Sequence, residues 1–218
     1  MRLVILTCAV VATALAFSMR QELAASPAMW LGLCIPYALL AALAVYVLYE
    51  DGTLLERARF HWGDVSIGVV SAILLLCGAW LVRNVMFPPG SKETVWLFRL
   101  LLQLGNVQRA PLLAFVLLLL VLAEEVVWRG MVLDALTERF GSRIGWILAA
   151  FAYGSSHLPT LVTLSDPSAG ANPLVVLAAF GCGLVWSFAA ARLGRLPPVV
   201  ISHLAFVYLA PPLMLSGW

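Results

Sequence analysis

The sequence predicts an all-α, multi-pass membrane protein, a transmembrane bundle of about seven to eight helices with one span per ~20 residues. Of the 218 residues, 63% are hydrophobic and 11% are charged, and the mean hydropathy is +1.00. An ordinary soluble domain has about 25% charged residues, so this chain lacks the charges that cover a surface in water. Its hydrophobic residues lie in long runs, and such runs satisfy their backbone groups in hydrocarbon only as helices. The composition argues against a soluble enzyme, a disordered chain and a nucleic-acid partner.

Apolar runs define the expected helices in chain order. The first run, Leu3–Phe17, resembles a signal peptide, because Arg2 precedes it and Ala14-Leu15-Ala16 resembles a cleavage site. We expect an uncleaved helix instead, since a second apolar run follows after a short loop. The later runs are Ala28–Tyr49, Val65–Val85, Pro111–Trp128, Ile144–His157, Pro173–Ala191 and Pro198–Leu215.

One further piece, Thr94–Gln108, is shorter and contains Arg99 and Gln103. We expect an interfacial or re-entrant helix there, with a poor eighth span as the alternative. The chain then divides into residues 1–110, which hold the N-terminal transmembrane helices and this interfacial helix, and residues 111–218, which hold the candidate site. Both parts belong to one membrane domain. Tryptophans near the span ends are expected to be interface anchors: Trp80, Trp96, Trp146, Trp186 and Trp218.

Ionisable residues inside apolar helices are costly and are usually functional. Glu124 and Glu125 follow a dozen apolar residues, and Arg129 comes four residues later. Neighbours on a helix point about 100° apart, so the two glutamates cannot have the same task. Glu125 and Arg129 can pair along one helix face, which leaves Glu124 without a local partner. An unpaired, desolvated carboxylate suits a general base near neutral pH.

Two histidines end or interrupt later apolar runs. His157 closes one run and His203 lies inside another. Consecutive antiparallel spans can place both histidines in one layer with Glu124, which predicts a polar cavity inside the bundle. One glutamate and two histidines can hydrolyse a substrate with an activated water, or hold zinc with an open position. The HExxH pattern of zincins is absent.

Three motifs in this order resemble those of the CPBP intramembrane protease family, which includes the CAAX prenyl endopeptidases and bacterial Abi-type proteins. The first motif, EExxxR, is matched by Glu124, Glu125 and Arg129. The second, FxxxH, is matched by Tyr153 and His157 with an exchange of aromatic residue. The third, HxxxN, begins at His203 after a glycine-rich helix, an Arg-x-Gly turn and a proline pair. The resemblance covers about half of the chain, from Leu112 to Leu209.

The resemblance implies an all-helical bundle that hydrolyses a peptide bond inside the membrane. It implies that Glu124 is the base for the catalytic water, with His157 and His203 as the other catalytic residues. Glu125, Arg129 and Tyr153 are expected to be supporting residues. Val207 stands where the family usually has an asparagine or another small polar residue, and the family asparagine is thought to help hold the oxyanion. Either His203 holds the oxyanion alone, or Ser202, Tyr208 or Asn172 substitutes for that asparagine.

The expected function is therefore an intramembrane endopeptidase of the glutamate type that acts on a membrane-tethered peptide or protein terminus. No cofactor is expected, and zinc is not favoured. The expected surroundings are a lipid bilayer, in a prokaryotic plasma membrane. Val207 motivates an alternative, a catalytically inactive family member that binds or regulates membrane proteins. A small transporter that uses Glu124 and His157 as a proton relay is a third hypothesis, although paired inverted halves are not recognisable.

Overall fold

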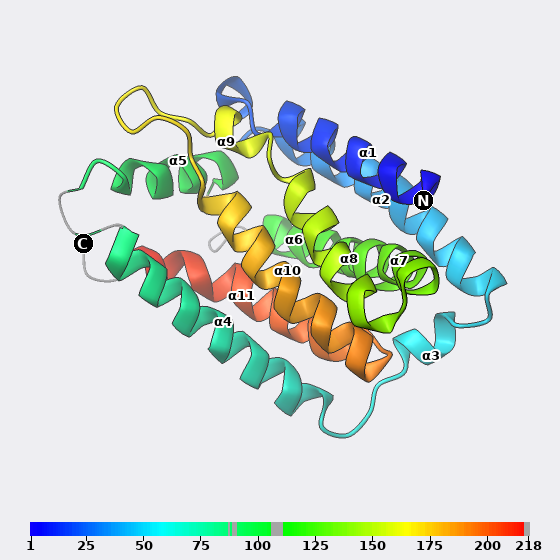
Figure 1. Ribbon diagram of the computed structural model, residues 1–218. Coiled ribbons are helices and arrows are strands. Elements are labelled where there is room, and N and C mark those ends of the chain that lie inside the picture. The colour runs from blue at the N-terminus through cyan, green and yellow to red at the C-terminus, as the bar shows by residue number, and fades with distance from the viewer. Residues whose placement is uncertain (87, 89–90, 106–110, 216–218) are drawn as a thin grey trace.

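The computed structural model describes residues 1–86, 88, 91–105 and 111–215 (Figure 1). These residues are 82% helical and form no strands, so the all-α prediction is confirmed. The longer helices are α1 (Arg2–Ser18), α2 (Pro27–Glu50), α4 (Asp64–Met86), α5 (Thr94–Leu104), α6 (Pro111–Glu125), α7 (Leu133–Phe140), α8 (Ser142–Ser156), α10 (Leu174–Leu193) and α11 (Pro197–Leu215). Short helices occupy Gln21–Leu23, Leu54–Ala58 (α3) and Thr160–Thr163 (α9), and a π-helix occupies Val126–Val132.

Local sequence signals explain where these helices begin and end. Ser26 caps α2, because its hydroxyl accepts a hydrogen bond from the Met29 amide at 3.2 Å. Pro27 follows at the first helical position, where a missing N–H has no cost. Gly194 ends α10 in the left-handed conformation that glycine adopts without strain, with φ of 69°. Serine, proline and glycine thus mark these helix ends through their ordinary backbone preferences.

Seven apolar runs were expected to be helices, and each of them is helical in the described part of the chain. Within the described residues, five helices are long and apolar enough to cross a membrane. The helices α1 and α8 have 17 and 15 residues, which is short for a full span. The expected run to Trp128 was too short, because the helical path continues through the π-helix to Phe140 and forms a 30-residue span.

The piece expected at Thr94–Gln108 is a short helix, α5, that ends at Leu104, while Gln108 and Trp218 lie outside the described residues. The Gln103 side chain donates hydrogen bonds to the carbonyls of Ser18 (2.8 Å) and Arg20 (3.0 Å). The amide of Gln103 therefore fastens α5 to the end of α1. This contact explains why a polar residue occurs in an apolar segment.

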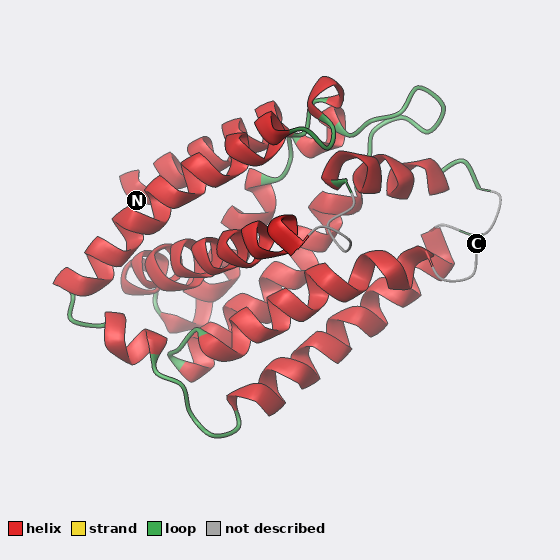
Figure 2. Ribbon diagram, turned by 180° about the vertical axis from the view of Figure 1, so that it is seen from behind, coloured by secondary structure: helices red, strands yellow, loops and turns green. Residues whose placement is uncertain are grey.

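Figures 1 and 2 show which helices lie side by side. The helix α10 packs along α8, and α11 packs along α4, while α1 and α2 lie together on the opposite side of α6 and α8. The main apolar core is formed mostly by α1, α2, the π-helix, α7, α8 and α10, with single buried residues from α6 and α11. The helix α4 contacts mainly α11, and much of its apolar surface is exposed, as expected for a helix that faces lipid.

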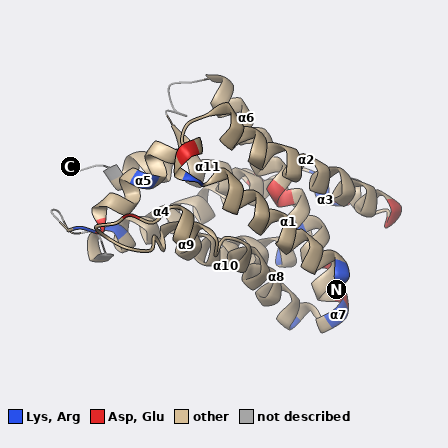
Figure 3. Ribbon diagram, turned by 90° about the horizontal axis from the view of Figure 1, so that it is seen from above, with Lys and Arg blue, Asp and Glu red and all other residues tan. Residues whose placement is uncertain are grey.

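Charged residues occupy only small parts of the ribbon, which is otherwise almost entirely uncharged (Figure 3). Two ion pairs join the loops at one end of the bundle. Arg195, in the turn between α10 and α11, binds the buried Asp64 at the start of α4 at 2.8 Å. Arg57 of α3 binds Asp134 of α7. These pairs hold the long connection before α4 against the helices that carry the candidate site.

Candidate active site

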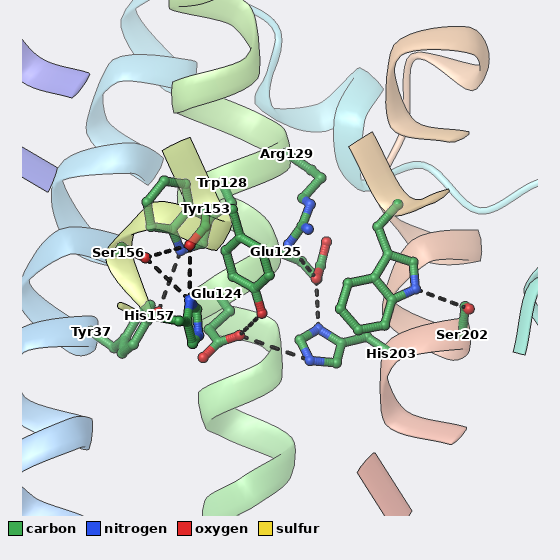
Figure 4. Close-up of polar contacts among 11 residues, drawn as sticks. Tyr37, Glu124, Glu125, Trp128, Arg129, Tyr153, Ser156, His157, Ser202 and His203 are labelled. Carbon is green, nitrogen blue, oxygen red and sulfur yellow. Dashed lines mark hydrogen bonds and ion pairs between the residues drawn. The ribbon is translucent and has the colours of Figure 1, made fainter. Parts of the chain in front are cut away.

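The first motif lies where an α-helix changes into a π-helix. Glu125 is the last residue of α6, and the wider turn begins at Val126. Inside the π-helix, the residues from Val127 to Val132 are all buried. π-helical turns are rare and often occur at functional sites, because they change the direction in which successive side chains point. Glu124 and Glu125 lie just before this turn, at the end of α6, and face different neighbours (Figure 4).

Glu125 forms the centre of a buried charge network. Its Oε1 atom accepts hydrogen bonds from Arg129 Nη1 at 3.1 Å and from His203 Nδ1 at 2.6 Å. The side chains of Glu125 and Arg129 are fully buried. The predicted i,i+4 pair is therefore present, and it lowers the cost of burying both charges. Because Nδ1 of His203 is committed to this carboxylate, only Nε2 of that ring is left to face Glu124.

Glu124 points to the other side of the helix, toward aromatic and histidine side chains (Figure 4). Its Oε2 atom accepts a hydrogen bond from the Tyr153 hydroxyl at 3.2 Å and lies 3.8 Å from Nε2 of His203. Its side chain is 14% exposed, whereas that of Glu125 is completely enclosed. The two adjacent glutamates thus differ in partners and in access, as their spacing predicts.

His157 occupies the turn that follows α8. Its Nδ1 atom donates to the Tyr153 carbonyl at 2.8 Å, which fixes the proton on Nδ1 because a carbonyl only accepts. The Ser156 hydroxyl lies 3.3 Å from the same nitrogen, and the ring packs edge-on against Tyr153 at 4.7 Å between centroids. In its neutral form the ring therefore presents Nε2 as an acceptor. The sequence-predicted trio of Glu124, His157 and His203 is gathered in one region (Figure 4).

Trp186 was expected to be an interface anchor, and this expectation was wrong. The residue is only 2% exposed, and its indole stacks on His203 with 3.9 Å between ring centroids and 27° between planes. Its Nε1 donates to the Ser202 hydroxyl at 3.1 Å. The helix α10 turns this side chain inward, which its position near a span end did not reveal. Trp186 thus fixes the plane of the His203 ring.

Tyr37 of α2 is a site residue that sequence reasoning missed. It is 1% exposed and accepts a hydrogen bond from Trp128 Nε1 at 3.4 Å. Figure 4 shows it beside His157 and Glu124, so α2 supplies one wall of the site. Its polar tip in an otherwise apolar run, directly after Pro36, was the available signal.

A cavity of about 530 Å³ opens beside the trio. Tyr153, His157 and His203 line it together with Val207, and the remaining lining is apolar, aromatic or glycine. This lining comes mainly from α4, α5, α10 and α11, including Leu74, Leu101, Val175, Phe206 and Met214. A pocket of this size and lining suits an apolar ligand that extends from a polar reaction centre.

The residues considered as substitutes for an asparagine at position 207 have other partners. The Ser202 hydroxyl accepts from Trp186, and the Tyr208 hydroxyl donates to the Ala114 carbonyl at 2.6 Å. The Asn172 amide donates to the Trp96 carbonyl at 3.0 Å and accepts from the Leu174 amide. None of these three residues is among those that line the cavity. In the described part of the chain, no three His, Cys, Asp or Glu residues are grouped so that they could hold a metal ion.

The fold and the site together define a multi-pass membrane protein with a buried glutamate and histidine centre next to an apolar cavity. Residues 106–209 match the family model described as Rce1-like, type II CAAX prenyl endopeptidase Rce1-like. The match covers a little under half of the chain, and it confirms the resemblance predicted from the three motifs. The matched family is one of proteases, and the five long apolar helices among the described residues support an integral membrane location. Comparisons with curated proteins and with solved structures give no match.

Proposed function

We propose that the protein is an intramembrane endopeptidase that hydrolyses a peptide bond near the terminus of a membrane-tethered peptide or protein. The observation that carries this proposal is the position of Glu124. Its Oε2 atom lies 3.8 Å from His203 Nε2 and 3.2 Å from the Tyr153 hydroxyl, and these partners line the apolar cavity. A carboxylate that is partly exposed and has histidine and tyrosine neighbours is a suitable general base.

The proposed reaction begins when Glu124 takes a proton from a water molecule that attacks the substrate carbonyl carbon. His157 positions this water, because its Nδ1 is bound to the Tyr153 carbonyl and its Nε2 is left to accept. The negative charge that develops on the carbonyl oxygen needs a donor. His203 in its protonated form donates from Nδ1 to Glu125 and from Nε2 to this oxygen. Glu124 then returns the proton to the leaving nitrogen as the C–N bond breaks.

Glu125 and Arg129 act at a distance from the reacting atoms in this scheme. Their fully buried pair holds His203 through Nδ1, and Trp186 stacks against the ring. We propose that these residues position His203, and that no metal or other cofactor takes part. Both histidines use Nδ1 for protein contacts, which leaves Nε2 of each ring to face the reaction.

The cavity supports a substrate that is held in the membrane. Its lining offers almost no hydrogen-bonding groups apart from Tyr153 and the two histidines. A lipid-modified or strongly apolar segment would gain about 25 cal/mol for each Å² of apolar surface that it buries there. The match to a family model of CAAX prenyl endopeptidases makes a prenylated CAAX end the first substrate to test.

A second function is favoured by one observation, the valine at position 207. Valine donates no hydrogen bond, and the loss of one oxyanion donor lowers kcat by ~10²–10³ in known hydrolases. A family member without proteolytic activity would bind membrane proteins through the same cavity. Such a protein would keep its biological effect when Glu124 is replaced by glutamine.

The test uses the purified full chain in liposomes with a fluorogenic peptide that ends in a prenylated Cys-aliphatic-aliphatic-X sequence. Mass spectrometry identifies the products of the wild type, Glu124→Ala and the exposed control Glu138→Ala. We expect one cleavage product with the wild type and the control, and none with Glu124→Ala. An unprenylated peptide of the same sequence shows whether the lipid is required. Equal cleavage by the wild type and Glu124→Ala would overturn the proposal.

A further inference from the structure

Tyr153 places a hydroxyl next to the proposed base. The second motif of the family has phenylalanine at this position, which has no hydroxyl, so this donor is a feature of the present chain. The Tyr153 hydroxyl donates to Oε2 of Glu124 at 3.2 Å, and Tyr153 lines the cavity. The residue is 4% exposed, which protects the hydroxyl from competition by bulk water.

The ring of Tyr153 is fixed by aromatic and cationic neighbours. Trp128 packs edge-on at 5.3 Å, and the Arg129 guanidinium lies over the ring face at 4.3 Å from its centroid. On the other side, Gly183 of α10 leaves room for the ring, because a Cβ atom there would be 3.1 Å from Tyr153 Cδ1. These contacts fix the position of the phenol oxygen, while the hydrogen on it can still turn about the C–O bond.

Position 207 lines the same cavity and lacks a donor. Val207 lies one helical turn after His203 on α11, at the last position of the third motif. The nearby polar residues Ser202, Tyr208 and Asn172 do not line the cavity. Besides Tyr153, His157 and His203, the cavity lining in the described part of the chain includes Trp186, whose N–H is already donated to the Ser202 hydroxyl.

We propose that the Tyr153 hydroxyl is the oxyanion donor that compensates for Val207. This inference rests on the proposed function and assigns a catalytic role to a residue at which the family usually has phenylalanine. In this proposal the tyrosine at position 153 supplies the hydrogen-bond donor that the valine at position 207 lacks.

The chemistry of the step explains how one hydroxyl serves two partners. Before reaction, the hydroxyl donates to Glu124 Oε2. As Glu124 takes the proton from water, its oxygen becomes a weaker acceptor, while the new C–O bond pushes the π electrons onto the carbonyl oxygen. The hydroxyl turns to this more negative oxygen and donates a hydrogen bond without transferring its proton. When the C–N bond breaks, Glu124 gives its proton to the leaving nitrogen and the hydroxyl returns.

The test is a double-mutant cycle with Tyr153→Phe, Val207→Asn and the double variant, in liposomes with the prenylated fluorogenic peptide. We expect Tyr153→Phe to lower kcat by ~10²–10³ with little change of KM, because phenylalanine keeps the ring contacts and loses only the donor. In the Val207→Asn background the same change should lower kcat by no more than about tenfold, since asparagine restores a donor. Tyr46→Phe is the matched control, because Tyr46 is 61% exposed on α2.

Two outcomes would overturn this inference. One is a kcat for Tyr153→Phe equal to that of the wild type. The other is a loss that is equally large with valine and with asparagine at position 207, which would show that the two positions act independently. The thermal unfolding midpoint of each variant separates a folding defect from a catalytic one. Glu124→Ala in the same assay separates the two proposals: if it is inactive while Tyr153→Phe is unaffected, only the role of Tyr153 fails.

Discussion

The Nδ1 atom of His203 lies 2.6 Å from Oε1 of Glu125, and this contact gives the two adjacent glutamates different tasks. Glu125 uses one oxygen for both His203 and Arg129 and is fully buried. Glu124, one residue earlier, faces the other nitrogen of the same ring from 3.8 Å and is partly exposed. One glutamate is therefore suited to hold the imidazole, and the other to accept a proton beside it.

Replacing Glu125 by glutamine tests the buried network. The change leaves Arg129 as an uncompensated charge in the core, and breaking a buried pair in this way costs about 3–5 kcal/mol. We expect the free energy of unfolding, measured by denaturant titration in detergent micelles, to fall by about that amount. The control Glu138→Gln changes an exposed glutamate on α7 and should stay within about 0.5 kcal/mol of the wild type. Equal stability of the two variants would contradict the role of Glu125.

Gly68 and Gly78 on α4 offer a matched pair that tests how closely this helix approaches α11. A Cβ atom at Gly68 would lie 2.8 Å from the Pro198 carbonyl oxygen, whereas at Gly78 nothing lies within 4 Å. We expect Gly68→Ala to destabilise the protein by about 1–3 kcal/mol through overpacking. Gly78→Ala should stabilise it by about 0.5–1 kcal/mol through helix propensity. Thermal unfolding of both variants checks the opposite signs, and equal shifts would argue against the close approach.

Trp186 should affect catalysis through the plane of His203. Replacing it by leucine removes a stacked contact of the kind worth about 0.5–1.5 kcal/mol. If all of that energy holds the ring in its reactive position, kcat falls by up to about tenfold while KM changes little. Trp146→Leu removes a comparable aromatic contact with Phe188, away from the site, and should leave kcat within about twofold. A similar kcat for both variants would contradict the proposal that Trp186 positions His203.

Metal chelators test the proposal that no metal takes part in the reaction. We expect EDTA and 1,10-phenanthroline to leave kcat within about twofold of the untreated value, since zinc sites need three protein ligands and no three His, Cys, Asp or Glu residues in the described part of the chain are grouped to hold a metal ion. The assay is cleavage of the prenylated peptide after dialysis against each chelator. Activity that disappears on dialysis and returns with added zinc would show that the glutamate mechanism is incomplete.

Much of this fold was predictable because long apolar runs in a chain with 11% charged residues have no alternative to helices. The pairing of Glu125 with Arg129 followed from helical spacing alone, and the structure confirms it. The contacts between helices were not predictable. The stacking of Trp186 on His203 depends on the rotation of α10, and the approach of Tyr37 depends on how α2 packs.

The π-helix after Glu125 also has no sequence signal that we recognise. It explains why the predicted end of this run, at Trp128, was too early. The contacts of the Tyr153 side chain at the site were likewise not predictable from the sequence. The sequence placed Tyr153 in the second motif. The direction of its hydroxyl toward Glu124, however, depends on the packing of α8 against the π-helix and α10.

The central claim is that Glu124 accepts the proton of the attacking water, and Glu124→Gln tests it most directly. Glutamine keeps the shape of the side chain and still accepts the hydrogen bond from Tyr153, but it cannot take up a proton in the reaction. We predict that single-turnover cleavage of the prenylated peptide falls by at least ~10²–10⁴, the usual contribution of a general base, at an unchanged unfolding midpoint. Cleavage by Glu124→Gln at the wild-type rate would contradict the account.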